Sequence, residues 1–184
     1  MFNATRKTAR VNPGVRRYKG WTVNESGIAF VVDILKALAE AELSAAHFYK
    51  RCAISFTNDE EFWNYLATQE EKHARNLAGI YRLLKKKPDR FSIGRRLNVA
   101  AIRTFNRGIE ENTKRLESGA LKQEYATILA RDIENAIIEN RFTEILLTDD
   151  IEYNTYVGEI VSDTQHHIEA IRRKITSSSR IKES

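Results

Sequence analysis

Cysteine and proline are scarce in this chain. Its 184 residues include one cysteine, Cys52, together with two prolines and eight glycines. A single cysteine excludes an internal disulfide and any cysteine-rich zinc site or rubredoxin-type iron site. Few helix breakers, with 42% hydrophobic and 30% charged residues, favour an all-α protein with one sizeable core and argue against disorder. Cys52 itself is interpreted as a small core residue.

The sequence also lacks long apolar runs. No run reaches the roughly 18 residues that a membrane-spanning helix needs. The N-terminus is positively charged, but no apolar segment follows it, so we predict neither a signal peptide nor a membrane span. Because an unpaired cysteine fits a reducing compartment, we expect a cytoplasmic protein.

Acidic residues are scarce at the N-terminus. Residues 1–27 carry six basic residues against Glu25, and this arm holds the whole net charge of +5: Arg6, Lys7, Arg10, Arg16, Arg17 and Lys19. We interpret the arm as a solvated or oligomer-contacting tail. Docking on phosphate, lipid or an acidic partner is the alternative, and nucleic acid is not the partner we expect. The lysine run 85–87 is interpreted as the cationic end of a helix.

Apolar residues recur at helical spacing in four long stretches, which predicts two helical hairpins joined by a long connection. The hairpins turn near residues 57–60, where Thr57 and Glu60 fit a capping box, and near residues 148–150. Asn24 and Ser26 are candidate caps for the first helix. The expected helices are about 24–52, 58–87, 120–147 and 151–176, with a crossover at 88–118 that contains a helical piece. The predicted domains are the basic arm 1–27, an antiparallel four-helix bundle 28–176 and a polar tail 177–184.

Glu70 and His73 are spaced three apart, so on a helix they share one face. The rest of that face is apolar: Trp63, Leu66, Leu77, Ile80 and Leu84. Burying a carboxylate and an imidazole there is costly unless something compensates them. Metal ligation, a buried salt bridge and a locally wet core are the three alternatives.

Asp163 and His166 repeat this spacing on the fourth predicted helix. Glu42 precedes Glu70 by 28 residues, and Glu134 precedes Asp163 by 29. Two matched half-sites favour metal ligation, with six residues meeting in the bundle: Glu42, Glu70, His73, Glu134, Asp163 and His166. Four carboxylates and two imidazoles balance two divalent cations and suit iron or manganese. His47 and His167 are predicted to lie off the ligand faces and to be exposed.

This pattern resembles the ferritin-like di-iron carboxylate superfamily, in which two helices each give a Glu and two give Glu-x-x-His. Within the superfamily, the chain most resembles the rubrerythrin or erythrin type. The residues that carry this resemblance are Glu42-x-x-Ala45-x-x-x-Tyr49 and Glu70-x-x-His73-Ala74. The resemblance implies two iron ions, or manganese or a mixed Fe/Mn pair, and a ferritin-like bundle. It implies that Glu42 and Glu134 are terminal ligands, that Glu70 and Asp163 bridge the metals, and that His73 and His166 each complete one site. Tyr49 is assigned to core packing or to a hydrogen bond with a ligand.

The chain departs from the family pattern at three positions. Asp163 replaces the usual glutamate, Arg141 stands where a counterpart of Tyr49 is expected, and Ile137 stands where rubrerythrins have an extra glutamate. A rubredoxin-like electron-donor domain is missing, so electrons must come from an external donor. The expected function is a ferroxidase-type or peroxidase-type reaction with dioxygen or hydrogen peroxide.

Three other functions and the oligomeric state stay open. The alternatives are iron handling or storage, hydroxylation of an organic substrate, and a helical interaction module with a vestigial site. A homodimer is one of the oligomers that the sequence allows.

Overall fold

Five α-helices make up most of the computed structural model, which describes residues 25–139 and 144–181. The helices are α1 (Glu25–Ser55), α2 (Glu60–Lys86), α3 (Val99–Glu117), α4 (Gln123–Glu139) and α5 (Ile151–Ile181). Two short 3₁₀ helices, η1 (Thr57–Asp59) and η2 (Pro88–Arg90), and two short strands, β1 (Ser92–Ile93) and β2 (Leu146–Leu147), lie between them. The predicted all-α class is confirmed.

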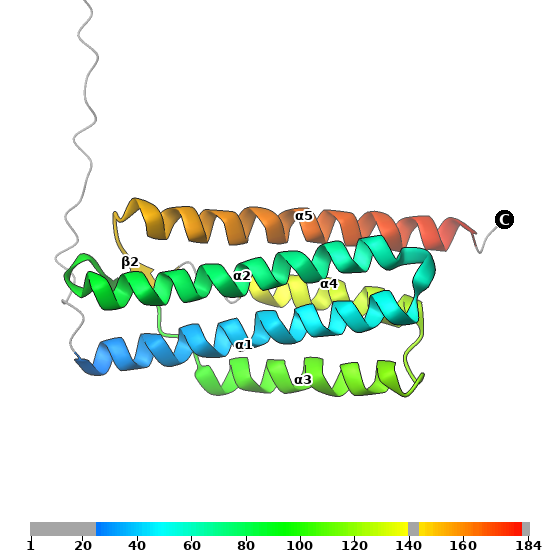
Figure 1. The fold of residues 1–184 in the computed structure, drawn as a ribbon, viewed down its shortest axis with the longest axis horizontal. Helices are drawn as coiled ribbons and strands as arrows, with labels where there is room; N and C mark the ends of the chain where they lie inside the picture. Colours follow the sequence, from blue (N-terminus) through cyan, green and yellow to red (C-terminus); the bar gives the residue numbers. More distant parts are fainter. Residues whose placement is uncertain (1–24, 140–143, 182–184) are drawn as a thin grey trace, which may run out of the picture.

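The helices lie side by side along one long axis (Figure 1). Helix α1 packs against both α2 and α3, and α5 packs against both α2 and α4. Helix α1 is therefore covered on two sides, and its sequence shows why: Leu35, Ala45 and Tyr49 form one buried row, and Ile34, Ala37 and Phe48 form another. A helix that is apolar over so much of its surface is stable only between neighbours.

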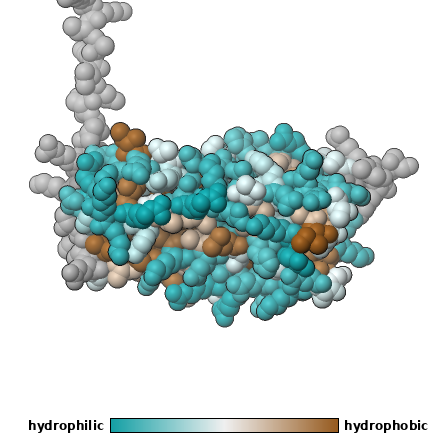
Figure 2. Space-filling model, viewed as in Figure 1, coloured by the Kyte–Doolittle hydropathy of each residue, from teal (hydrophilic) through white to brown (hydrophobic). Residues whose placement is uncertain are grey.

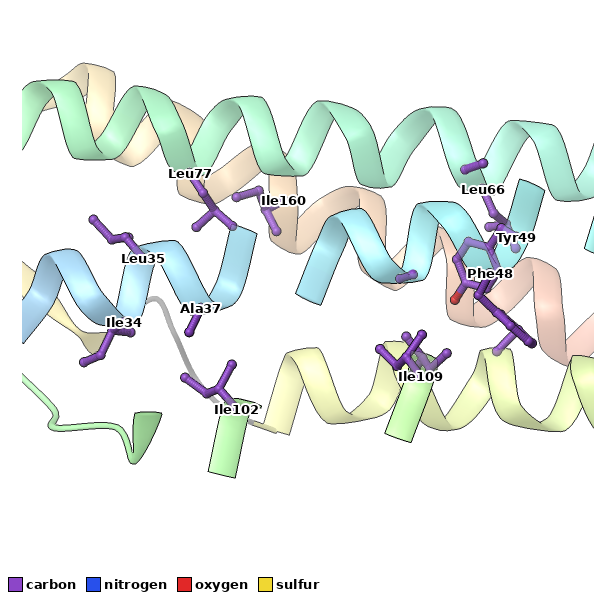
Figure 3. Packing of buried hydrophobic residues seen from close by; sticks show 14 of the residues in the cluster. Ile34, Leu35, Ala37, Phe48, Tyr49, Leu66, Leu77, Ile102, Ile109 and Ile160 are labelled. Carbon is purple, nitrogen blue, oxygen red and sulfur yellow. The ribbon is translucent and has the colours of Figure 1, made fainter. Parts of the chain in front are cut away.

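The core joins residues from all five helices (Figure 3). Leu77 of α2 lies beside Ile160 of α5, with Leu35 of α1 facing them. Ile102 of α3 lies next to Ala37 of α1 on the other side. The outer face in Figure 2 is mainly hydrophilic, with scattered hydrophobic residues. The segment predicted as a crossover thus contains a full helix, α3, that covers α1.

The end of α2 is confirmed and its predicted start is corrected. The helix ends at Lys86, and Pro88 then opens η2, as the sequence indicated. The predicted capping box of Thr57 and Glu60 is wrong, because Thr57 lies inside η1 and the residue that precedes α2, Asp59, makes no capping hydrogen bond with its side chain. The Asp59 carboxylate instead accepts a hydrogen bond from Gln123 at the start of α4.

The second hairpin differs more from the prediction. The third predicted helix was extended to 147, but α4 ends at Glu139 and residues 146–147 form β2. Strand β2 pairs antiparallel with β1, with Ser92 opposite Leu147. Helix α5 continues to Ile181, so the predicted tail is helical over 177–181. Residues 1–24 of the predicted arm, with the candidate cap Asn24, lie outside the described residues, whereas residues 25–27, with the candidate cap Ser26, belong to α1.

Within the described residues, no helix is both long enough and apolar enough to cross a membrane.

Candidate metal centre

Five ionisable side chains meet inside the helical body, and each is at most 4% exposed. They come from four helices: Glu42 from α1, Glu70 and His73 from α2, Glu134 from α4, and His167 from α5. Each sits in an apolar row of its helix, so burial of that row carries the polar group inside. The folding of four amphipathic helices thus assembles the cluster.

The five residues form two overlapping groups that share Glu70. In each group one ligand-type atom per residue lies within 4.8 Å of the others: Glu42, Glu70 and His73 in one, and Glu70, Glu134 and His167 in the other. A carboxylate has two oxygens, so Glu70 can serve both groups. Two buried Glu/His clusters that could each hold a metal ion therefore lie side by side.

Both imidazoles turn the same nitrogen toward the shared carboxylate. His73 Nδ1 lies 3.0 Å from Glu70 Oε2, and His167 Nδ1 lies 3.0 Å from Glu70 Oε1. His167 Nδ1 also hydrogen bonds with Glu134 Oε2 at 3.3 Å. The two rings are stacked, with centroids 5.6 Å apart. Their lone pairs can therefore converge on ions placed beside Glu70.

Tyr49 supports Glu134 from behind. Its hydroxyl donates a hydrogen bond of 2.8 Å to Glu134 Oε1, and both residues are fully buried. The other oxygen, Oε2, faces His167. The bond holds the Glu134 carboxylate in one orientation. Tyr49 has both of the roles considered for it, because its ring also packs in the core.

Burial and mutual repulsion shift the carboxyl pKa values apart. Burial, together with the negative charge of Glu70, raises the pKa of Glu42 well above its usual value. Burial and the Glu70 charge likewise raise the pKa of Glu134, to about 7, against hydrogen bonds from His167 and Tyr49. Burial also opposes ionisation of Glu70, but the neighbouring imidazoles of His167 and His73 hold its pKa below the usual range.

His167 carries the compensating charge in the metal-free cluster. Burial acts to lower the pKa of this imidazole, but the Glu134 and Glu70 carboxylates raise it to about 10. The cluster therefore holds protons where a metal ion would supply positive charge.

The donor set fits a metal ion on an observation independent of charge. Glu42 Oε2 is buried and has no hydrogen-bond partner among the described residues. Such a buried atom costs about 1–3 kcal/mol unless something binds it. Carboxylate oxygens and imidazole nitrogens are the ligands that iron, manganese and zinc accept.

Four of the six predicted ligands meet in the cluster, and His166 does not. Glu42, Glu70, His73 and Glu134 are brought together, whereas His166 is exposed. The predicted exposure of His167 is wrong, because His167 is fully buried in the cluster. His47 is exposed as predicted. The sequence had a signal for the correct histidine: Ile160 and Ile171, seven before and four after His167, are both fully buried.

Asp163 lies at the rim of the cluster and belongs to neither group. Its side chain is 23% exposed, and its Oδ2 accepts a hydrogen bond of 3.0 Å from Lys72 Nζ. The same oxygen lies 3.5 Å from His73 Nε2, the nitrogen that points away from Glu70. The structure therefore places Asp163 behind His73 and outside both donor groups, whereas the resemblance implied a bridge between two metals.

The residue that stands where a second bridging carboxylate is expected is Thr164. It precedes His167 by three, as Glu70 precedes His73, and it is 1% exposed. Its hydroxyl donates a hydrogen bond of 2.7 Å to the Ile160 carbonyl. The two half-sites are thus unequal, with three carboxylates in place of the predicted four. Arg141 and the side chain of Ile137 lie outside what the structure describes.

Searches against protein-family models, curated proteins and solved structures return no match.

Proposed function

We propose that this chain is a ferritin-like dinuclear metal protein, with two iron ions, that reacts with dioxygen or hydrogen peroxide. In this proposal α1, α2, α4 and α5 form the four-helix bundle and α3 is an added helix beside α1. Two ferrous ions would supply electrons for the reduction of either oxidant, and an external donor would restore them.

The observation that carries the proposal is the position of Glu70. Its two oxygens face two histidine nitrogens at 3.0 Å each, and it belongs to both donor groups. A carboxylate shared by two sets of donors is the simplest arrangement that brings two cations close together. The proposed ligands are Glu42, Glu70 and His73 for one ion, with Glu70, Glu134 and His167 for the other.

The remaining residues would position the ligands. Tyr49 holds Glu134, and Asp163 can accept a hydrogen bond from His73 Nε2, which leaves the Nδ1 lone pair free for a metal. Because Thr164 supplies no charge, three carboxylates leave one positive charge of two divalent ions unbalanced. We propose that this charge favours an anionic or readily polarised oxidant at the site.

The proposal is tested by iron loading followed by oxygen. Wild-type protein is titrated anaerobically with Fe(II), exposed to dioxygen or hydrogen peroxide, and followed by an oxygen electrode and by Fe(III) absorbance. Glu70→Gln removes the shared charge, and Glu71→Gln changes the adjacent residue, whose side chain pairs with Lys50 at the surface. We expect rapid, stoichiometric oxidation in wild type and Glu71→Gln, and at least a tenfold slower reaction in Glu70→Gln.

If the protein binds iron but the bound Fe(II) is oxidised no faster than free Fe(II), the proposed redox activity would be contradicted and iron handling would be favoured. Absence of bound iron would favour the vestigial site.

A further inference from the structure

Positive charge is concentrated in one folded segment outside the metal centre. Residues 82–107 carry nine basic residues against the single acid Asp89. The arm 1–24 carries six more and no acid, and the rest of the chain has 15 basic residues against 24 acidic ones. The part of the chain beyond residue 27 is neutral as a whole, but its charge is sharply divided between a basic end and an acidic remainder.

Seven of these nine basic side chains are exposed and form no ion pair with any described residue: Arg82, Lys85, Lys86, Arg95, Arg96, Arg103 and Arg107. We name these seven the basic surface. The other two, Lys87 and Arg90, pair with Asp150 and Asp149. Some cations elsewhere, such as Lys50 and Arg51, are likewise paired with carboxylates.

The basic surface spans the last turns of α2, the β1 connection and the first half of α3, and α2 and α3 lie on opposite sides of α1 (Figure 1). Figure 1 places the end of α2, β2 and the start of α1 at one end of the body. The arm joins α1 at this same end, because α1 begins at Glu25. The six basic residues of the arm therefore precede the folded body in the sequence at the end where α1 begins.

The residue types of the basic surface indicate which kind of anionic partner it can bind. Five of its seven members are arginines, whose planar guanidinium groups bind phosphate oxygens in pairs. The Arg96 guanidinium lies 5.7 Å from the centre of the Phe30 ring, a contact that holds it on the surface. None of the large exposed hydrophobic residues belongs to residues 82–107, so this segment offers no apolar anchor for a membrane and no exposed aromatic ring for stacking unpaired bases.

Contrary to the expectation from the sequence, we propose that the basic surface binds the phosphate backbone of double-stranded DNA, without sequence preference. Duplex DNA carries about one negative charge per 1.7 Å of its axis, a density that such a surface can neutralise with release of counterions. Binding of this kind needs no metal, so the inference stands apart from the function proposed above.

The test is fluorescence anisotropy of a labelled duplex of about 30 base pairs with the full-length, metal-free chain at several salt concentrations. The variant Arg95→Glu/Arg96→Glu reverses two charges of the basic surface. The control, Arg172→Glu/Arg173→Glu, reverses an adjacent, exposed arginine pair on α5 and changes the net charge equally. We expect micromolar binding by wild type at low salt, about tenfold weaker binding by the first variant with a shallower salt dependence, and near-wild-type binding by the control.

A second variant, Arg82→Glu/Lys86→Glu on α2, guards against a folding defect, and circular dichroism checks each protein. The Arg82→Glu/Lys86→Glu variant should weaken DNA binding by about the same factor as Arg95→Glu/Arg96→Glu. Equal loss in the control would show a net-charge effect alone, and unchanged binding in both test variants would assign the contact elsewhere. Failure of wild type to bind the duplex, or a preference for vesicles of anionic phospholipid over DNA, would overturn the proposal.

Discussion

Tyr49 and Glu134 lie 85 residues apart in the sequence and are joined by a buried hydrogen bond of 2.8 Å. The bond ties α1 to α4, two helices that otherwise touch little, because α4 packs mainly on α5. It also sets which oxygen of Glu134 faces His167. One hydroxyl therefore acts both in the packing of the helices and in the geometry of the cluster.

Replacing Tyr49 by phenylalanine tests both roles. Tyr49→Phe keeps the ring but leaves Glu134 Oε1 buried without its donor, so we expect the metal-free protein to lose about 1–3 kcal/mol of unfolding free energy. Urea unfolding monitored by circular dichroism measures this. Tyr125→Phe, on the exposed surface of α4, is the control and should change stability by less than about 0.5 kcal/mol. Equal effects of the two substitutions would argue against the bond.

Metal binding should release protons at neutral pH. The pKa of His167 is raised to about 10 and that of Glu134 to about 7, so the metal-free cluster holds protons that a cation must displace. Calorimetric titration with Zn(II) at pH 7, in buffers of different ionisation enthalpy, should report at least about one proton released per cluster. Binding without proton release would contradict this electrostatic account.

The same shifts give the pH dependence of stability. A histidine with a raised pKa stabilises the fold fully below its unfolded value of about 6.5, and this contribution is lost as pH rises through about 10. A carboxyl whose pKa is raised to about 7 likewise costs stability as pH rises from about 4.5 to 7. The metal-free chain should therefore melt at progressively lower temperature from pH 5 to pH 10, while the metal-loaded chain changes less.

Asp150 caps α5 and ties it to α2. Its Oδ1 accepts hydrogen bonds from the backbone N–H groups of Glu152 and Tyr153, at 3.1 and 3.2 Å, and its Oδ2 accepts one from Lys87 at 3.0 Å. We expect Asp150→Ala to cost about 1 kcal/mol, the usual value of a lost cap. Asp149→Ala, which removes only the exposed pair with Arg90, should leave the thermal midpoint nearly unchanged.

Asp163 offers a test of positioning without loss of a ligand. Asp163→Asn weakens the acceptor behind His73 Nε2 and should lower metal affinity about tenfold, since groups that orient a ligating histidine have effects of that size. Glu159→Gln is the control, because Glu159 also forms an ion pair with Lys72, as Asp163 does, but does not face His73. Competition with a metal indicator measures both affinities. An unchanged affinity in Asp163→Asn would assign Asp163 to the surface ion pair alone.

Much of the fold and most of the site could be predicted because helical spacing is a local property. Glu70 and His73 share a face on any helix, and the apolar residues around them mark that face as buried. Glu42 and Glu134 were found in the same way, as single acids within apolar rows. These predictions needed no knowledge of how the helices pack.

The error in α5 came from assuming that the second hairpin copies the first. His73 follows Glu42 by 31 residues, whereas His167 follows Glu134 by 33. The α4–α5 connection is longer than the α1–α2 connection, and it contains β2 and its pairing with β1. Strands of two residues depend on a partner far away in the sequence, so local pattern could not reveal them. Asp163 and His166 were predicted because they are three residues apart, as Glu70 and His73 are. Each lies one position before the buried residue, Thr164 or His167.

The central claim is that His167, and not His166, completes a cluster that binds two metal ions. The direct measurement is the stoichiometry of Co(II) bound under anaerobic conditions, read from visible absorption and metal analysis, for wild type, His166→Ala and His167→Ala. We predict two ions for wild type and His166→Ala, and no more than one for His167→Ala. Two ions in His167→Ala, or loss of metal in His166→Ala alone, would contradict the account.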